Sequence, residues 1–179
     1  MRDWNTIITV HEGAFTRACH YLEQFGPVRK SGFYNVLLMR LNDPLEILRV
    51  IHEQLAHESE IAFWIARFMP VERTFTFNSP MEFEERAREA ASFWLPSLAG
   101  SSFHLRMHRR GFKGRLSSAD EERLLDQFLL ERLSEAGAAG RIAFDNPDAI
   151  IALETLGTQA GLSLWERDDL KRFPLLHLD

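Results

Sequence analysis

The chain has 179 residues, of which 45% are hydrophobic and 26% are charged, with a single cysteine. This composition is that of a globular protein and excludes the fibrous and disordered classes. A chain of this length buries roughly 70% of the surface that its unfolded form exposes, so it needs neither disulfides nor metal to form a core. It has no membrane-length apolar run and no secretory signal pattern. We therefore expect a soluble, cytoplasmic protein that binds no membrane, and one cysteine fits a reducing compartment.

The net charge is −5, from 21 Lys and Arg against 26 Asp and Glu. Taken alone, this acidic balance disfavours a nucleic-acid partner, because a polyanion binds mainly through Lys and Arg. The charge is unevenly distributed along the chain, however. Residues 104–115 carry five Arg or Lys and no acidic residue, which leaves −10 for the rest of the chain. This basic segment is the main functional clue in the sequence.

The first seventy residues alternate between strand and helix patterns. The predicted elements are strands at 4–10, 28–30, 35–41 and 61–69 and helices at 13–25 and 43–57. The second helix opens on Asp43-Pro44, which places a capping side chain before a proline at the first helical position. The order strand, helix, strand, strand, helix, strand is the split βαβ arrangement of a ferredoxin-like unit.

The second part begins with Ser79-Pro80-Met81-Glu82, a capping box that opens a helix. The predicted elements are helices at 79–98 and 118–137 and strands at 103–108, 141–144, 149–156 and 162–165. The run Ala149 to Leu153 is apolar on both faces, as in a central strand that is covered on both sides. We expect an α+β fold with an N-terminal domain over 1–72, packed on a second domain with a mixed sheet over 73–179.

The basic segment combines a strand with a loop. Strand alternation puts Arg106 and His108 on the face opposite Leu105 and Met107. The loop that follows leads to a helix start that we assign to a Ser118 cap, where free N–H groups favour an anion. Phosphate is the natural ligand of such a segment, and Phe112 offers a ring on which an unpaired base can stack. The candidate phosphate contacts are Arg106, Arg109, Arg110, Lys113 and Arg115.

A second interpretation of the basic segment is structural. The helix at 118–137 is rich in Asp and Glu, and the basic residues can form a solvated surface that pairs with it. The salt dependence of RNA binding separates the two interpretations. Five contacts with single-stranded phosphates give a logarithmic salt slope of about −3.5, at about −0.7 for each contact.

Other chemistries have weaker support. His52 and His57 resemble the zinc motif His-Glu-x-x-His, but the second histidine falls one residue late, and no cysteine pair supports zinc elsewhere. We expect no metal and no cofactor. Glu154 lies among apolar residues and is a candidate catalytic carboxylate, although it has no acid or base companion in the sequence. We favour a structural role for it, at a strand edge or in a pair with an arginine.

Several of these segments together resemble the THUMP RNA-binding domain. The resemblance rests on Phe103 to Gly111, ending in Arg109-Arg110-Gly111, on Phe144-Asp145-Asn146-Pro147-Asp148, and on the strand that ends at Glu154. The first part of the chain resembles the ferredoxin-like domain that precedes THUMP in that family. The resemblance covers nearly the whole chain. It implies that Arg109, Arg110 and Gly111 contact RNA and that the Asn146 to Asp148 turn shapes the fold.

The closest form in the family is the stand-alone adaptor of tRNA cytidine N4-acetylation. The resemblance therefore implies a tRNA-binding protein without catalytic activity, which presents tRNA to a separate RNA acetyltransferase. One alternative is a protein-interaction module with an acidic docking surface and no RNA binding. Another is a hydrolase or transferase built around Glu154 and a histidine.

Overall fold

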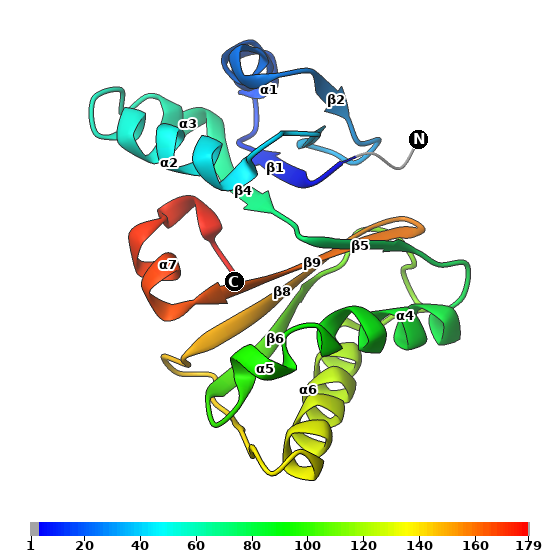
Figure 1. Ribbon diagram of the computed structural model, residues 1–179. Coiled ribbons are helices and arrows are strands. Elements are labelled where there is room, and N and C mark those ends of the chain that lie inside the picture. The colour runs from blue at the N-terminus through cyan, green and yellow to red at the C-terminus, as the bar shows by residue number, and fades with distance from the viewer. Residues whose placement is uncertain (1–3, 179) are drawn as a thin grey trace. The chain divides into compact units, whose positions relative to one another are not determined.

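The computed structural model describes residues 4–178, and the chain divides into two compact units (Figure 1). The first unit runs up to Val71 and includes the later segment Leu170–His177. The second unit comprises Glu72–Asp169 together with Leu178. The sequence places the whole of 73–179 in one domain, whereas the structure groups Leu170–His177 with the first unit. Within residues 4–178, no helix has the length and apolar character needed to cross a lipid bilayer.

The first unit contains a four-stranded antiparallel sheet in the order β2-β3-β1-β4. Its elements are β1 (Thr6–Val10), α1 (Phe15–Leu22), η1 (Glu23–Phe25), β2 (Val28–Lys30), β3 (Val36–Met39), α2 (Pro44–Leu55), α3 (Ile61–Trp64), β4 (Ile65–Pro70) and η2 (Pro174–Leu176). Strand β1 lies between β3 and β4, which confirms the split βαβ order of a ferredoxin-like unit. The helices bury apolar stripes, Ala18 and Leu22 on α1 and Leu48 and Ile51 on α2.

Two local features of this unit test the sequence patterns. The Asp43 side chain accepts a hydrogen bond of 3.0 Å from the Glu46 N–H, with Pro44 in the first turn, so the predicted start of α2 is confirmed. The strand predicted at 61–69 is wrong in its first four residues, because Ile61–Trp64 forms the short helix α3. The backbone turns there, with the Phe63 N–H donating to the Glu60 carbonyl, and strand pairing starts only at Ile65, opposite Val10.

The second unit contains a mixed five-stranded sheet in the order β5-β9-β8-β6-β7. Its elements are β5 (Arg73–Thr76), α4 (Pro80–Ser92), α5 (Leu95–Leu98), β6 (Ser102–His108), α6 (Ser118–Glu135), β7 (Arg141–Ile142), β8 (Ala149–Leu156) and β9 (Gln159–Glu166). Strand β6 runs parallel to β7 and β8, and the other pairs are antiparallel. The helix α7 (Arg167–Arg172) follows β9 directly. The α+β class and the mixed sheet are therefore confirmed, while the short strand β5 and helix α7 had no clear signal in the sequence.

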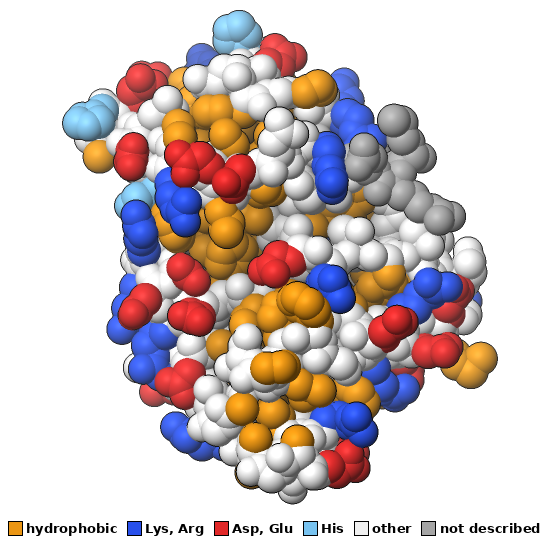
Figure 2. All heavy atoms as spheres, in the orientation of Figure 1, with side chains coloured by type: hydrophobic (Ala, Val, Ile, Leu, Met, Phe, Trp, Pro, Cys, Tyr) orange, Lys and Arg blue, Asp and Glu red, His pale blue; other side chains and the backbone are white. Residues whose placement is uncertain are grey.

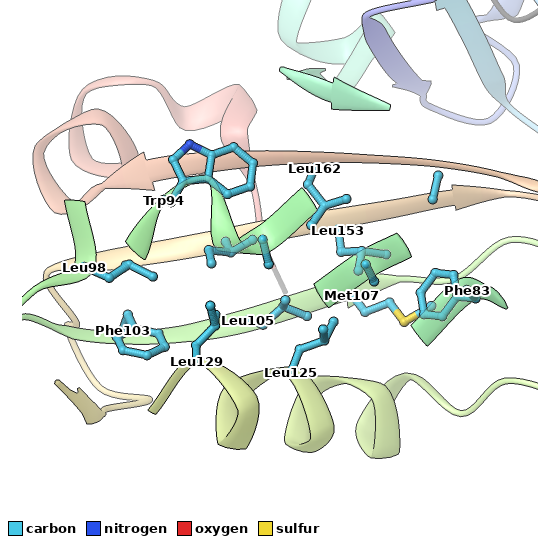
Figure 3. Close-up of a cluster of buried hydrophobic side chains, with 14 of the residues drawn as sticks. Phe83, Trp94, Leu98, Phe103, Leu105, Met107, Leu125, Leu129, Leu153 and Leu162 are labelled. Atoms are coloured by element: carbon cyan, nitrogen blue, oxygen red, sulfur yellow. The ribbon is translucent and has the colours of Figure 1, made fainter. Parts of the chain in front are cut away.

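Helices α4, α5 and α6 cover one face of this sheet, and their apolar side chains meet those of the strands in one buried cluster (Figures 1 and 3). The strands contribute Phe103, Leu105, Met107, Ile151, Leu153 and Leu162, the helices contribute Phe83, Leu98, Leu125 and Leu129, and the turn between α4 and α5 contributes Trp94. All eight residues of β8 are buried, which confirms the predicted central strand. Phe103, Leu105 and Met107 point into the core, so Arg106 and His108 emerge on the other face of β6, as alternation requires.

Carboxylates of α6 occupy the free edge of β6. Strand β7 pairs with β6 at Ser102 and Phe103, and within residues 4–178 the later residues of β6 have no strand on that side. There the Leu105 N–H donates to Asp126 Oδ1 at 2.8 Å, and the Met107 N–H donates to Glu122 Oε1 at 2.7 Å. The spacing matches, because four residues of a helix rise about 6 Å and two residues of a strand span about 6.6 Å. Two acidic residues of α6 thus fix the strand that leads to the basic loop.

Burial in this position raises the pKa of Asp126 to about 7, and the nearby Glu122 charge acts in the same direction. The Leu105 N–H opposes this shift, because it stabilises the carboxylate. The folded protein therefore holds the Asp126 proton more tightly than the unfolded chain does. The resulting stabilisation is complete below pH 4 and is lost as the pH rises to about 7.

We expect Asp126→Asn to remove this pH dependence. The amide oxygen can still accept the Leu105 N–H, but the side chain no longer has to ionise inside the protein. The free energy of unfolding of the variant, measured in urea from pH 4.5 to 8, should rise relative to that of the wild type as the pH increases. Glu131→Gln, a change of equal charge at an exposed position on α6, is the control. Parallel curves for Asp126→Asn and the wild type would contradict the assignment.

Candidate nucleic-acid interface

The basic loop, which we define as residues 109–115, joins the end of β6 to the start of α6. Its backbone turns at Gly111 (φ +92°), Phe112 (φ +50°) and Gly114 (φ +76°), a left-handed region that favours glycine. The helix that follows is capped by Ser117, not by Ser118 as the sequence pattern suggested. The Ser117 side chain accepts a 3.4 Å hydrogen bond from the Asp120 N–H. The predicted capping signal is therefore real but begins one residue earlier.

Arg110 anchors the loop to the hairpin formed by β8 and β9. Its Nη1 lies 2.6 Å from Glu154 Oε2, and the side chains are only 14% and 1% exposed, respectively. Its backbone is also held, because the Arg110 N–H donates to Thr155 Oγ1 at 2.9 Å and its carbonyl accepts the Gly157 N–H at 2.8 Å. Glu154 thus has the arginine partner that the structural interpretation of the sequence anticipated.

Gly111 lies directly against this hairpin. A Cβ atom placed on Gly111 would stand 2.7 Å from the Gly157 Cα and 3.0 Å from its backbone nitrogen. Real Cβ atoms essentially never approach backbone so closely, so residue 111 must be glycine if the loop is to keep its place. The structure therefore brings Arg110 and Gly111 together as the base of the loop, and both are needed for its position.

The remaining basic residues face solvent to different degrees. Lys113 and Arg115 are exposed, and Arg109 is half-buried, with its Nη1 donating to the Gly111 carbonyl at 2.5 Å. Arg106 lies outside the loop, on β6, where its side chain is 41% exposed and 4.0 Å from a Glu122 oxygen. These four cations thus lie on β6 and in the loop that follows it. Among the described contacts of the four, Arg106 shows the pairing with α6 that the structural interpretation of the basic segment predicted.

Phe112 does not present a free ring for a base. Its ring packs on Phe77, with 5.0 Å between centroids, and belongs to the margin of the buried cluster. The Arg115 guanidinium lies over it, 4.8 Å from the ring centroid. The ring therefore supports the loop from inside and holds Arg115 by a cation–π contact.

The turn motif at 145–148 ties together three parts of the second unit. Asp148 accepts hydrogen bonds from the Ser102 N–H at 2.8 Å and from the Ser102 hydroxyl at 2.7 Å. Arg167 donates to Asp148 at 2.8 Å and to the carbonyls of Asn146 and Pro147. The two hydrogen bonds from Ser102, followed by the charges of Arg167 and Arg141, hold the pKa of Asp148 below its usual value. The motif shapes the fold, as the resemblance implied.

The described residues contain no cluster of side chains that could bind a metal ion. Across 4–178, no three His, Cys, Asp or Glu side chains come together as a group that could hold a metal ion. The His52 ring instead packs edge-on against Phe173, with 5.4 Å between centroids. Glu154, the carboxylate on which the enzyme hypothesis rests, is bound to Arg110.

No model of a known protein family matches the sequence, and no curated protein matches it either. Solved structures do resemble the chain. PH1313 from Pyrococcus horikoshii Ot3 aligns with a TM-score of 0.61 and 13% identity, over 90% of this chain and 54% of that protein. TrmN from Thermus thermophilus aligns with a TM-score of 0.59 and 15% identity, over 89% of this chain and 44% of that protein.

A third similar structure is that of a 4-thiouridine synthetase in complex with RNA and bound ATP. It aligns with a TM-score of 0.51 and 13% identity, over 92% of this chain and 42% of that protein. The chain thus spans about half the length of these three proteins. At such low identity the likeness establishes the fold alone. The chain has a THUMP-like α+β fold.

The ion pair of Arg110 and Glu154 predicts strong coupling between the two residues. Arg110→Met removes the guanidinium that pairs with the buried Glu154 carboxylate and should cost about 3–5 kcal/mol of unfolding free energy. The double variant with Glu154→Leu removes both charges and should recover most of that loss. Urea unfolding of the two single variants and the double variant measures the coupling. Additive losses would show that the two side chains act independently.

The close approach of Gly111 to Gly157 predicts a difference between two glycines of the same loop. Gly111→Ala combines an unfavourable positive φ with a backbone clash. In Gly114→Ala the added Cβ meets open space, so the positive φ is the only source of strain. We therefore expect Gly111→Ala to lower the Tm clearly more than Gly114→Ala. Thermal unfolding followed by circular dichroism makes the comparison, and equal losses would contradict the assigned contact.

Proposed function

We propose that this protein binds tRNA through the basic loop and acts as a non-catalytic adaptor in tRNA base modification, most specifically in cytidine N4-acetylation by a separate RNA acetyltransferase. The observation that carries the RNA-binding part is the placement of the exposed cations. Lys113 and Arg115 project from a loop whose base is fixed by a buried ion pair and a glycine contact. A loop whose backbone is already fixed loses little conformational entropy when its side chains bind phosphates.

The comparisons add support to the same proposal. One protein with a similar fold was solved as a 4-thiouridine synthetase in complex with RNA. Arginine and lysine side chains offer phosphate oxygens charge-assisted hydrogen bonds, and such contacts dominate the affinity of proteins for nucleic acids. In this proposal Arg106, Arg109, Lys113 and Arg115 contact phosphates, whereas Arg110 and Gly111 hold the loop in place.

The chief alternative is a protein-interaction module that docks through an acidic surface. Figure 2 shows Lys and Arg side chains interspersed with Asp and Glu on the face that it draws, without one continuous acidic patch there. An enzyme built on Glu154 is disfavoured as well, because the side chain is buried and bound to an arginine. RNA binding therefore has the better structural support.

Removal of the loop cations should weaken the binding of total tRNA and make it less dependent on salt. Arg109→Ala, Lys113→Ala and Arg115→Ala together remove three phosphate contacts, so the logarithmic salt slope should become shallower by about 2. Filter binding at several salt concentrations measures affinity and slope together. The triple variant Arg86→Ala, Arg123→Ala and Arg132→Ala removes the same charge from α4 and α6 and is the matched control. An unchanged slope in a folded loop variant would refute the site.

The adaptor role has its own test. Sequencing of tRNA from a strain that lacks the gene should show loss of N4-acetylcytidine, and complementation with the loop variant should fail to restore it. Complementation with the α4 and α6 control variant should restore it. An unchanged modification profile would limit the function to RNA binding.

A further inference from the structure

Phe144 carries an exposed aromatic ring in the second unit. The residue lies between β7 and the turn motif, and it is 76% exposed. Its ring approaches the His104 imidazole, with 5.3 Å between centroids and an angle of 48° between the planes. Single exposed apolar residues are common on proteins, so exposure alone carries no functional meaning. The way in which this ring is held, and what surrounds it, give the position its interest.

The backbone on both sides of Phe144 is tightly fixed. Before it, the Ala143 N–H donates to the Phe103 carbonyl at 3.1 Å, and the Ala143 carbonyl lies 2.8 Å from Nδ1 of the buried His104. After it, the turn is fixed by the bonds of Asp148 to Ser102 and by those of Arg167 to the turn carbonyls. The ring is thus displayed on a rigid support.

Two arginines lie near Asp148, in the turn that follows Phe144. Arg167 is bound to the turn itself, and Arg141, which is exposed, lies close enough for its charge to help hold the pKa of Asp148 low. The turn has two carboxylates, Asp145 and Asp148, and Asp148 is hydrogen-bonded to Ser102 and Arg167. An aromatic face for a base and guanidinium groups for phosphates, carried by the same turn region, form a combination that proteins use to bind single-stranded nucleic acid.

The ring is also placed to act together with the basic loop. His104, Arg106 and His108 lie on the same face of β6, so Arg106 stands between the Phe144 ring and the loop. From His104 to His108 the strand rises about 13 Å, which is the length of about four stacked nucleotides at 3.4 Å each. One short RNA segment can therefore reach both the loop and the ring.

Other rings of the second unit fit this role less well. Phe112 packs on Phe77 and is covered by Arg115, as described above. Phe93 is 53% exposed, but the Arg73 guanidinium lies 4.0 Å above its ring and occupies one face. Phe144 thus offers the most accessible aromatic surface among the three.

We propose that Phe144 is a stacking platform for an unpaired base of the RNA whose phosphates are bound by the basic loop. The inference rests on the RNA binding proposed above and adds to it a second contact of different chemistry. The affinity from phosphate contacts falls as the salt concentration rises, whereas the affinity from stacking on an uncharged ring does not depend on counterion release. The two contributions can therefore be measured separately.

The test uses the full chain and a fluorescein-labelled single-stranded RNA of twelve nucleotides, with anisotropy measured at several salt concentrations. Phe144→Ala should weaken binding roughly fivefold to 150-fold, the range for loss of one base–aromatic stack, and should leave the salt slope unchanged. Phe144→Trp should bind as tightly as the wild type or more tightly. Phe144→Leu, which keeps the apolar bulk but has no ring, should behave like Phe144→Ala.

Phe93→Ala is the matched control, since it removes another exposed ring from the same unit and should bind like the wild type. Urea midpoints of all variants should stay near the wild-type value, because the Phe144 ring contributes little to the core. Wild-type affinity in Phe144→Ala or Phe144→Leu, with normal binding by the wild type, would overturn the stacking site alone. Failure of the wild type to bind RNA in a salt-dependent manner would instead refute the proposed function.

Discussion

The hairpin of β8 and β9 determines where the basic loop stands, because it holds the loop at one point by charge and at the next by shape. Arg110 and Glu154 form a buried ion pair, and such a pair is costly to leave half-made. The next residue, Gly111, packs so closely against the Gly157 backbone that there is no room for a Cβ atom. These two contacts therefore fix the position of the exposed cations that follow in the loop, although those cations have few contacts of their own.

The charge of the chain acquires a different meaning once these positions are known. Acidic residues outnumber basic ones, yet some of the acids act inside the fold. Asp126 and Glu122 accept backbone N–H groups of β6, and Glu154 binds Arg110. These carboxylates therefore support the basic surface instead of opposing it. A count of charges along the chain cannot distinguish an acid that faces solvent from one that fixes a strand.

The sequence predicts most of the fold because its strongest signals are local. Asp43-Pro44 begins a helix as expected, and the doubly apolar β8 lies at the centre of its sheet. The helix at Ile61–Trp64 escaped prediction because four apolar residues carry no period that separates helix from strand. Strand β5 is equally short and is defined by its pairing with β9, more than eighty residues away.

The candidate site shows the same division between local and distant information. Alternation along β6 correctly places Arg106 and His108 opposite the core, but it does not show which basic residues of the loop are buried. The burial of Arg110 depends on the β8–β9 hairpin, whose Glu154 lies some forty residues later in the sequence and pairs with Arg110. The two phenylalanines illustrate the point as well. Phe112, which has the more basic neighbours, packs inward on Phe77, while Phe144 remains exposed beside a rigid turn.

The carboxylates along β6 also bear on how copies of this protein meet one another. An unpaired strand edge offers its backbone N–H groups to any extended chain, which is a common route to aggregation. In β6 the N–H groups of Leu105 and Met107 are already bound to side chains of the protein's own helix. A strand from a second molecule would have to displace two carboxylates to pair there. The side of the sheet that leads to the basic loop is therefore protected against self-association while its cations stay accessible.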